Sequence, residues 1–478
     1  MKMTLLDLDN LELTTIEDAA RIVGKSVDNI RDYIQRGRIS KYNLEGTRIA
    51  VAKNGELRIS LSELRAFLQL MSRGDEKHYS PGLNIELGFY DLSETERTKH
   101  VHRLHPYLGK FIPQLVEWFL IRYFAEDSLI LDPFMGSGTT LIQGNELGIH
   151  TIGIDISEFN CLISRVKSAK YDLPLVTREV LEIEQRVSTF SKYLNKSTQV
   201  NLSLFPEERM DELKSSLLKE CNSDYLRQWF APNALLEMLY YKRLIPLYQN
   251  QELLQVLLSR AVRSSRLIPH YDLATPKVPL PVGVKYWCRK HNRNCIPIDN
   301  CISKIHQYSK DTIRRITQFD GLRKEKTMQV IQGDSRTIDL TYYLSLPPLN
   351  GRLLDGIFTS PPYVGQIDYH DQHTYAYELF GFTREDSLEI GPKKKGKSRS
   401  AQQSYSEGII EVLKNTMKFL KPAGLVFIVA NDKYDLYPHI AEESGLIIKE
   451  RFQRAVTKRT EQGDSPYQET IFMMEKVT

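Results

Sequence analysis

The chain of 478 residues lacks the features that mark several protein classes. No apolar run approaches the ~20 residues that a membrane-spanning helix requires, so no membrane is expected as a partner. Five cysteines, an odd number in a long chain, argue against a disulfide framework and for a reducing compartment. The N-terminal residues are too acidic and too poor in apolar side chains for a signal peptide, so we expect the cytoplasm. The net charge of +4 is small, so any surface that binds a nucleic acid must be local.

What the chain does have is length and strong local patterning. Its 478 residues exceed one ordinary domain, so we expect two or three compact units. Apolar runs of the length of buried strands recur at 128–131, 150–154, 328–332, 353–359, 424–430 and 470–474. Segments with helical spacing accompany several of these runs, which predicts an α/β fold with a predominantly parallel sheet.

A glycine-rich turn follows the first of these runs. It reads Asp132-Pro133-Phe134-Met135-Gly136-Ser137-Gly138-Thr139-Thr140 and precedes a segment with helical spacing. Glycines in such a turn let the backbone approach a nucleotide-like ligand closely. The next run ends in Asp155, an acid that can accept hydrogen bonds from ribose hydroxyls. The turn has neither the lysine of a phosphate-binding P-loop nor the third glycine of a dinucleotide fingerprint.

A second motif, Ser360-Pro361-Pro362-Tyr363, ends the run 353–359. Two prolines stop the strand and leave the Ser360 hydroxyl and the Pro361 carbonyl as fixed acceptors. Tyr363 offers a flat stacking surface beside them. The exocyclic amino group of a nucleobase needs this combination of two acceptors and a stacking face. Taken alone, the motif is equally well explained by a proline-ended strand with a tyrosine in the core.

With these motifs in this order, the chain resembles the amino-group DNA methyltransferases, which make N4-methylcytosine or N6-methyladenine. The resemblance covers roughly residues 95–170 and 325–478. It implies a Rossmann-like class I methyltransferase core, S-adenosyl-L-methionine as cofactor and double-stranded DNA as partner. A cognate restriction endonuclease is a further candidate partner. The resemblance also implies that Ser360, Pro361, Pro362 and Tyr363 form the catalytic loop.

The resemblance also implies which residues bind the cofactor. The segment 102–113 is similar to the family segment that closes over the methionine end of the cofactor, and Asp334 corresponds to the acid near its adenine. The expected cofactor-binding residues are His105, Tyr107, Lys110, Phe111, Asp132, Phe134, Gly136, Ser137, Gly138, Thr139, Asp155, Ile156, Asp334 and Ser335.

The target base is predicted from the first catalytic residue. In the family, serine at this position mostly accompanies N4 methylation of cytosine, whereas Asp or Asn mostly accompanies N6 methylation of adenine. The motif order is the family's alpha arrangement, many of whose members act on adenine. We predict cytosine N4 and keep adenine N6 as the alternative. Methylation at cytosine C5 is not expected, because none of the five cysteines follows a proline. A catalytically silent DNA-binding regulator and an RNA methyltransferase are the remaining alternatives.

The N-terminal segment is predicted to be a separate unit. A capped helix over 14–24, a second helix from about Ser26, a hairpin and a third helix over 61–70 resemble the winged helix-turn-helix of excisionase and MerR-type regulators. This implies that Lys25, Asn29 and Arg31 face a major groove. The alternative is a helical interaction domain that never contacts DNA.

We therefore expect four segments along the chain. They are 1–75, a winged helix-turn-helix domain; 76–170, the first part of the methyltransferase core with the cofactor loop; 171–326, a helical insert for target recognition; and 327–478, the second part of the core with the catalytic loop.

Basic stretches are the candidates for contact with DNA phosphates. Two lie in the insert, one with Arg260, Arg263 and Arg266 and one with Lys285, Arg289, Lys290, His291 and Arg293. A third, 391–400, contains no acid, and we expect that it does not fold by itself. Its candidate DNA-binding residues are Lys393, Lys394, Lys395 and Lys397.

Four potential metal ligands occur close together in the insert. Cys288, His291, Cys295 and Cys301 have the donor types of a zinc site, but their spacing is compressed compared with the usual two ligand pairs. We assign no metal ligand and expect a basic turn with packed cysteines.

Overall fold

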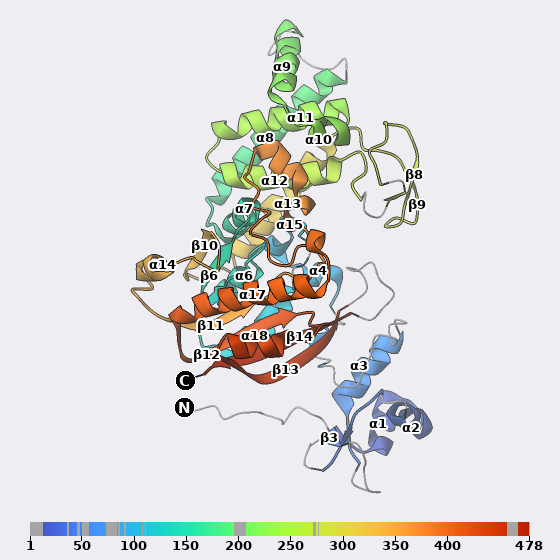
Figure 1. Ribbon diagram of the computed structural model, residues 1–478. Coiled ribbons are helices and arrows are strands. Elements are labelled where there is room, and N and C mark those ends of the chain that lie inside the picture. Colours follow the sequence, from blue (N-terminus) through green and yellow to red (C-terminus); the bar gives the residue numbers. More distant parts are fainter. Residues whose placement is uncertain are drawn as a thin grey trace. The chain divides into compact units, whose positions relative to one another are not determined.

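A computed structural model gives the structure of the protein (Figure 1). It divides into two compact units. The larger unit contains residues 98–425 and 443–445, and the smaller contains 1–97, 426–442 and 446–477. The structure describes residues 13–35, 38–44, 48–49, 57–72, 84, 87–89, 92–107, 109, 111–195, 207–270, 274–275, 277–456 and 467–477.

A parallel sheet forms the centre of the larger unit. Its strands follow the order β10-β6-β5-β11-β12, with bounds β5 Leu129–Asp132, β6 His150–Asp155, β10 Met328–Gln332, β11 Leu354–Thr359 and β12 Leu420–Ala430. The boundary between the units falls within β12. In register, Leu129 lies beside His150, and Ile357 lies beside Leu131. Every residue of β5 is buried, as expected for a parallel strand covered on both faces.

The connections of this sheet create a switch point. From β5 the chain moves to β6 and then to β10 on one side, and β11 returns to the other side of β5. In open parallel sheets, ligands bind outside the carboxyl ends of the strands at such a reversal. The gap between the ends of β5 and β11 is therefore the expected ligand position.

Helices surround the strands of the larger unit. Local signals set several boundaries: Ser157 and Asp172 cap α7 and α8 through side-chain hydrogen bonds, and Pro113 begins α5. The helices outside the insert are η4 His100–Arg103, α5 Pro113–Tyr123, α6 Thr139–Glu146, α7 Glu158–Ser168, α14 Thr341–Ser345, α15 Tyr369–Gln372, α16 Thr374–Phe380, η8 Lys393–Lys395, α17 Arg399–Thr416 and η9 Met417–Phe419.

The predicted insert is helical, with a small sheet between two of its helices. Its elements are α8 Leu173–Leu194, α9 Glu207–Glu220, α10 Asp224–Trp229, α11 Pro232–Leu244, η6 Ile245–Leu247, α12 Gln251–Ser265, β7 Ala274–Thr275, β8 Tyr286–Cys288, β9 Arg293–Cys295 and α13 Ile302–Asp320. Figure 1 shows these helices gathered beyond the sheet. Apolar residues from the helices of the insert share one cluster with Phe159 of α7 and Tyr375 of α16, so these helices pack onto the core, whereas the small sheet has a separate cluster of its own.

The smaller unit contains short N-terminal elements and an antiparallel pair of long strands. The elements are β1 Leu13–Thr14, α1 Ile16–Val23, α2 Val27–Gln35, β2 Lys41–Tyr42, β3 Arg48–Ile49, β4 Ile59–Ser60, α3 Leu61–Ser72, α4 Glu94–Arg97, α18 Tyr437–Glu443, β13 Leu446–Val456 and β14 Tyr467–Lys476. Thr15 caps α1 and Gly24 ends it in the left-handed conformation, as the sequence predicted. Buried residues of α1, α2, β4 and α3 form one small core. Within the described ranges, no helix has the length and apolarity needed to cross a bilayer.

Candidate active site

A pocket lies at the carboxyl ends of β5, β6, β10 and β11. Its empty volume is about 880 Å³, counted with its open mouth. The predicted site residues that line it are Tyr107, Phe111, Phe134, Gly136, Ser137, Thr139, Asp155, Ile156, Asp334, Ser335, Ser360 and Pro362. The structure therefore brings ten of the fourteen predicted cofactor residues, together with Ser360 and Pro362 of the predicted catalytic loop, into one cavity at the switch point.

Two side chains of α7 donate hydrogen bonds to the backbone of the glycine turn. Ser164 Oγ donates to the carbonyl oxygen of Gly136 at 3.0 Å, and the buried Lys167 Nζ donates to that of Ser137 at 2.6 Å. Gly136 has a φ of +51°, and a Cβ built on it would lie 3.1 Å from Tyr107 Oη. A side chain at this position would therefore both strain the turn and fill the pocket wall.

Asp155 is the central carboxylate of the pocket. Its Oδ2 accepts from the Gly136 N–H at 2.9 Å, and its Oδ1 accepts from the Ser157 N–H at 2.8 Å and Asn160 Nδ2 at 3.1 Å. Burial raises the pKa of Asp155 to about 6, although these three hydrogen bonds act in the opposite direction. The carboxyl is thus fixed in direction and titrates close to neutral pH.

The residues after β10 complete the wall opposite β5. Ser335 Oγ donates to the carbonyl oxygen of Pro133 at 2.6 Å, which links this loop to the glycine turn. Both oxygens of Asp334 accept hydrogen bonds from Arg336. Burial acts to raise the pKa of Asp334, but the hydrogen bonds from Arg336 outweigh burial and lower it. Asp334 is therefore a fixed, ionised group in the pocket.

Comparison with known proteins identifies the family. A family profile for N6/N4 methyltransferases, described as DNA methylase, matches residues 73–165. The type II methyltransferase M.MjaII of Methanocaldococcus jannaschii is 40% identical over 96% of this chain and 96% of its own length. The chain belongs to the type II methyltransferases of this N6/N4 DNA methylase family.

More distant relatives align over part of the chain. The type II methyltransferase M.BsoBI of Geobacillus stearothermophilus is 24% identical over 60% of this chain and 53% of its own. The type II methyltransferase M.MvaI of Kocuria varians is 26% identical over 30% of this chain and 33% of its own.

Membership of this family shows that the cofactor of the protein described here is S-adenosylmethionine.

The pocket also has the unsatisfied groups that a polar cofactor requires. Ser137 Oγ, Asn160 Oδ1 and Glu389 Oε2 are buried, line the pocket and have no hydrogen-bond partner among the described residues. Buried polar atoms rarely remain unpaired, so each is expected to gain a partner from a bound ligand. Glu389 is held by its other oxygen, which pairs with His370 Nδ1 at 2.5 Å. These atoms fit a cofactor that carries hydroxyl, amino and ammonium donors.

Sequence reasoning missed about half of the pocket wall. The additional lining residues are Gly109, Pro133, Met135, Ser157, Asn160, Tyr369, His370, Leu388, Glu389, Ile390 and Val412. The positions of Ser157 and Asn160 could have been inferred, because they open the helix directly after Asp155. The residues from 369 onward belong to no motif and reach the pocket only through the path of the chain after β11.

Asp132 was expected to bind the cofactor but does not line the pocket. Its carboxylate accepts from Thr140 Oγ1 at 2.6 Å, from Thr359 Oγ1 at 2.7 Å and from the Phe134 N–H at 3.1 Å. Burial raises its pKa to about 6, against the effect of these hydrogen bonds. Asp132 therefore joins β5, α6 and β11 from behind the pocket.

Two further expected cofactor residues also lie behind the pocket wall. Gly138, with a φ of +76°, begins α6, and His105 packs among the rings of Phe159, His373 and Tyr375. Burial, together with the nearby His373, lowers the pKa of His105 well below its usual range, so the imidazole is neutral. Lys110, also expected at the cofactor, lies outside the described residues.

The rest of the predicted catalytic loop surrounds the pocket residues Ser360 and Pro362. Pro361 is buried within the turn, and Tyr363 is half-buried beyond the lining. Thr359, directly before the loop, is anchored to Asp132. The loop therefore leaves the sheet from a fixed point.

The predicted DNA-binding residues are exposed. In the smaller unit, Lys25 precedes α2, Asn29 lies on it, and Arg31 forms ion pairs with Glu17 and Asp28. In the larger unit the four lysines Lys393, Lys394, Lys395 and Lys397, here called the lysine turn, are all exposed.

The lysine turn is ordered by contacts within the protein, contrary to the expectation that 391–400 does not fold by itself. Lys393–Lys395 form η8, the Lys393 N–H donates to the carbonyl of Ile367, and the Lys394 N–H donates to Asp368. These hydrogen bonds to residues 367 and 368, just after the predicted catalytic loop, order a segment whose composition alone did not predict a fixed structure. The bonds also tie the lysine turn to a segment that follows Ser360 by only a few residues in the sequence.

The expectation that the first basic stretch of the insert contacts DNA phosphates is wrong for two of its three arginines. Arg260 and Arg266 are buried, and Arg260 pairs with Asp311 at 2.8 Å while stacking on Tyr308. The Arg260 guanidinium holds α12 against α13, and Arg266 Nη2 donates to the carbonyl oxygen of Pro269, so neither group is available to phosphates. Of the second stretch, by contrast, Lys285, Arg289, Lys290, His291 and Arg293 are all exposed.

Proposed function

We propose that this protein is a site-specific methyltransferase that methylates the N4 amino group of cytosine in double-stranded DNA. The supporting observation is the shared pocket, in which Ser360 and Pro362 face the same cavity as Asp155 and the glycine turn. A methyl donor and an amino acceptor must meet in one place for direct transfer, and this arrangement provides that place.

The residues around the pocket suggest how the cofactor is held. Asp155 would accept hydrogen bonds from the ribose hydroxyls, and Asp334 and Ser335 would lie beside the adenine ring. Tyr107 and Phe111 would close over the methionine end beside the glycine turn. When bound, S-adenosylmethionine supplies an electrophilic methyl group. Asp132, Gly138 and His105 would act as positioning residues, because the side chains that they support line the pocket.

The catalytic loop would activate the amino group of the base. An aromatic amine is a poor nucleophile, since its lone pair is delocalised into the ring. The Ser360 hydroxyl and the Pro361 carbonyl would accept its two hydrogens and favour the pyramidal, reactive form. A base within a duplex cannot reach the pocket, so it must flip out, and Tyr363 would stack on it.

Adenine N6 is the alternative acceptor, because both bases present the same type of amino group to Ser360. The preference for cytosine rests on serine at this position. A catalytically silent DNA-binding regulator is a further alternative, against which the complete catalytic loop argues.

DNA binding is proposed to involve three segments. The lysine turn would contact backbone phosphates near the pocket. The insert 171–326 would contribute target recognition, and the domain 1–75 would place Lys25, Asn29 and Arg31 in a major groove as a winged helix-turn-helix. The segments 76–170 and 327–478 would then form the catalytic core. A cognate restriction endonuclease and a cytoplasmic location complete the proposal.

The function is tested by transferring labelled methyl groups from S-adenosylmethionine to DNA and to RNA, followed by nucleoside analysis. We expect N4-methylcytosine in DNA, and none with the Ser360→Ala variant. Label in N6-methyladenine would select the alternative base, and label in RNA would reject a DNA substrate. A wild-type protein that binds the cofactor but transfers no methyl group to any substrate would favour the silent regulator.

The role of the N-terminal domain needs a separate test in the full chain. Lys25→Ala and Asn29→Ala together should reduce discrimination between target and non-target DNA, with cofactor affinity unchanged. An unchanged methylation pattern would assign this domain to another partner and leave recognition to the insert.

A further inference from the structure

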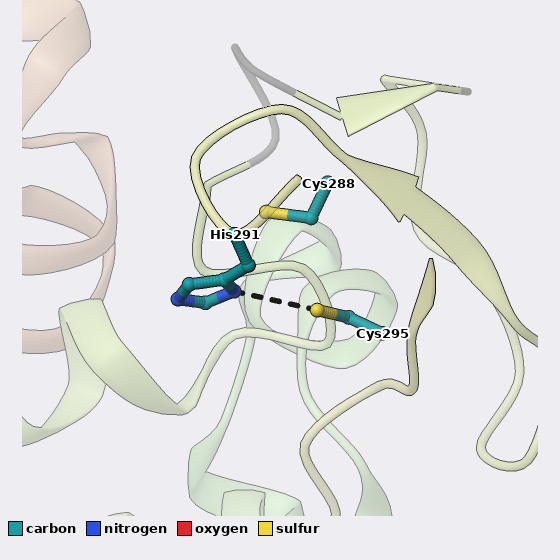
Figure 2. Close-up of side chains that lie close together, drawn as sticks. All are labelled: Cys288, His291 and Cys295. Atoms are coloured by element: carbon teal, nitrogen blue, oxygen red, sulfur yellow. Dashed lines mark hydrogen bonds between the residues drawn. The ribbon is translucent and has the colours of Figure 1, made fainter. Parts of the chain in front are cut away.

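A cluster of metal-binding side chains lies outside the pocket, in the small sheet of the insert. Figure 2 shows Cys288, His291 and Cys295 directed toward one another. Cys288 ends β8, His291 lies in the turn, and Cys295 ends β9, whose pairing with β8 closes the hairpin. One donor atom from each of the three residues lies within 4.8 Å of the others.

The separation of these donors agrees with coordination of one zinc ion. His291 Nδ1 lies 3.3 Å from Cys295 Sγ. Zinc bonds of about 2.3 Å to sulfur and about 2.0–2.1 Å to nitrogen, at a tetrahedral angle, place such atoms about 3.6 Å apart. The ion would therefore require movements of only a few tenths of an ångström between these two side chains. Sulfur and imidazole nitrogen are also the ligands that zinc prefers.

His270 is the candidate for a fourth ligand, but its ring must move to reach the ion, because the donor atoms that lie within 4.8 Å of one another belong to Cys288, His291 and Cys295. The ring centroids of His270 and His291 are 5.5 Å apart, with the ring planes at 74°. Two imidazoles on one tetrahedral zinc ion have centroids about 5 Å apart, given the same bond lengths. His270 precedes β7, which pairs with β8, so sheet formation brings it to the hairpin.

The cysteine that the sequence suggested as fourth ligand lies elsewhere. Cys301 precedes α13, and its backbone N–H donates to the buried Glu237 Oε2 at 2.6 Å. Its side chain is buried in the helical core of the insert. The sequence therefore led us to expect no metal here, whereas the structure brings two of the three cysteines and His291 together and leaves Cys301 outside the cluster.

The surroundings of the cluster explain why a metal would be needed. The small sheet has its own core, whose fully buried members are Ile268, Ala274, Tyr286 and Cys288. Its large apolar side chains that remain exposed are Val278, Val282, Val284, Trp287 and Ile296. Substructures below about 40 residues rarely bury enough apolar surface to be stable without a metal or disulfides. Cys288 and Cys295 form no disulfide, so a metal ion is the cross-link that could stabilise the small sheet.

We propose that His270, Cys288, His291 and Cys295 bind one structural Zn²⁺ ion. Binding releases the two thiol protons, and two thiolates with two neutral imidazoles balance the charge of the ion. The zinc then joins the segment before β7, the strands β8 and β9 and the turn between them, and supplies folding energy that the small core lacks.

The site also fixes the exposed basic residues of the hairpin. Arg289, Lys290 and Arg293 lie between or beside the ligands and are exposed. If the insert contacts DNA, as the proposed function holds, zinc would order these cations before binding. Loss of zinc should then weaken DNA binding while leaving cofactor affinity unchanged, because the pocket lies elsewhere in the unit.

The direct test is metal analysis of the full-length protein purified without chelators. We expect about one zinc per chain, and cobalt substitution should give the visible absorption of a tetrahedral cobalt–thiolate site. Cys288→Ser and Cys295→Ser should each lose the metal, and His270→Ala should lower zinc affinity. Cys301→Ala and Cys221→Ser are the matched controls, since both are buried cysteines outside the cluster, and both should keep the metal.

These measurements are independent of methyl transfer, so they test the site even if the proposed function is wrong. Wild-type protein that contains no zinc and gives no cobalt–thiolate absorption would overturn the proposal, whatever the variants do. Zinc retained by the Cys288→Ser/Cys295→Ser double variant would do the same. Loss of zinc in Cys301→Ala, with folding intact by circular dichroism, would transfer the fourth position from His270 to Cys301.

Discussion

The titration of Asp155 should make cofactor binding depend on pH in a range that is easily measured. Burial raises its pKa to about 6 from an ordinary value of 3.8. A carboxyl accepts hydrogen bonds from two ribose hydroxyls fully only when it is ionised. The affinity for S-adenosylmethionine should therefore be nearly constant above about pH 7 and fall as the pH drops through about 6.

The size of the effect follows from the fraction of ionised carboxyl. If only the ionised form binds, the apparent dissociation constant rises about twofold at pH 6 and about tenfold at pH 5. The sign for the free protein is opposite. Because the folded pKa lies above the unfolded one, ionisation of Asp155 lowers the stability of the unliganded fold as the pH rises from about 4 to about 6. Weak binding at pH 5 would thus not be caused by unfolding through this group.

Calorimetric titrations of the cofactor between pH 5 and pH 8 would measure the change in affinity, and thermal unfolding of the unliganded protein between pH 4 and pH 7 would measure the change in stability. Asp155→Asn should bind more weakly at pH 8 and lose the dependence on pH. Asp132→Asn is the matched control, because burial also raises the pKa of Asp132 to about 6 but its carboxyl lies behind the pocket. A folded Asp155→Asn variant that keeps the midpoint near pH 6 would refute the assignment of this carboxylate to the cofactor.

Three further changes address the turns around the pocket. Gly136→Arg should lower cofactor affinity by more than about tenfold by calorimetry, because its side chain would occupy pocket space beside Tyr107 that the cofactor needs. Gly381→Ala, with a φ of +77° and nothing within 4 Å of its Cβ, should leave affinity unchanged. Pro361→Ala should reduce kcat far more than cofactor affinity, since the loop acts mainly in the transition state, and an equal fall in both would indicate a structural role. Neutralising the lysine turn should weaken binding to any DNA sequence and flatten its salt dependence, whereas four Lys→Arg changes should preserve both.

The parts of the site that follow strand ends were predictable from sequence. Asp155, Asp334 and Ser360 each come directly after an apolar run, and parallel strands bring such positions to one edge of a sheet. The local signals are strong there because a buried strand and a glycine or proline turn have opposite compositions. The same reasoning placed the helices of the insert and the caps of α1.

Other residues depended on partners that are distant in sequence. Glu389 reaches the pocket because His370 pairs with it, and no motif marks either residue. Arg260 was expected to contact DNA phosphates, but in the structure it forms a buried ion pair with Asp311 of α13. The ring of His270 lies near that of His291 in the cysteine cluster, beside the pairing of β7 with β8. Spacing along the chain carries no information about such contacts, since they are set by packing.

One buried contact explains how the chain can carry a long insert between its two reactive motifs. Thr359 donates to Asp132 across the adjacent strands β11 and β5, so the catalytic loop and the glycine turn start from a common anchor. The insert enters between α7 and β10, on the other side of β5, and packs onto α7. Lengthening such a connection costs only about 0.6 kcal/mol for each doubling of its length. The sequence of the insert can therefore vary without changing the separation of Ser360 from the glycine turn.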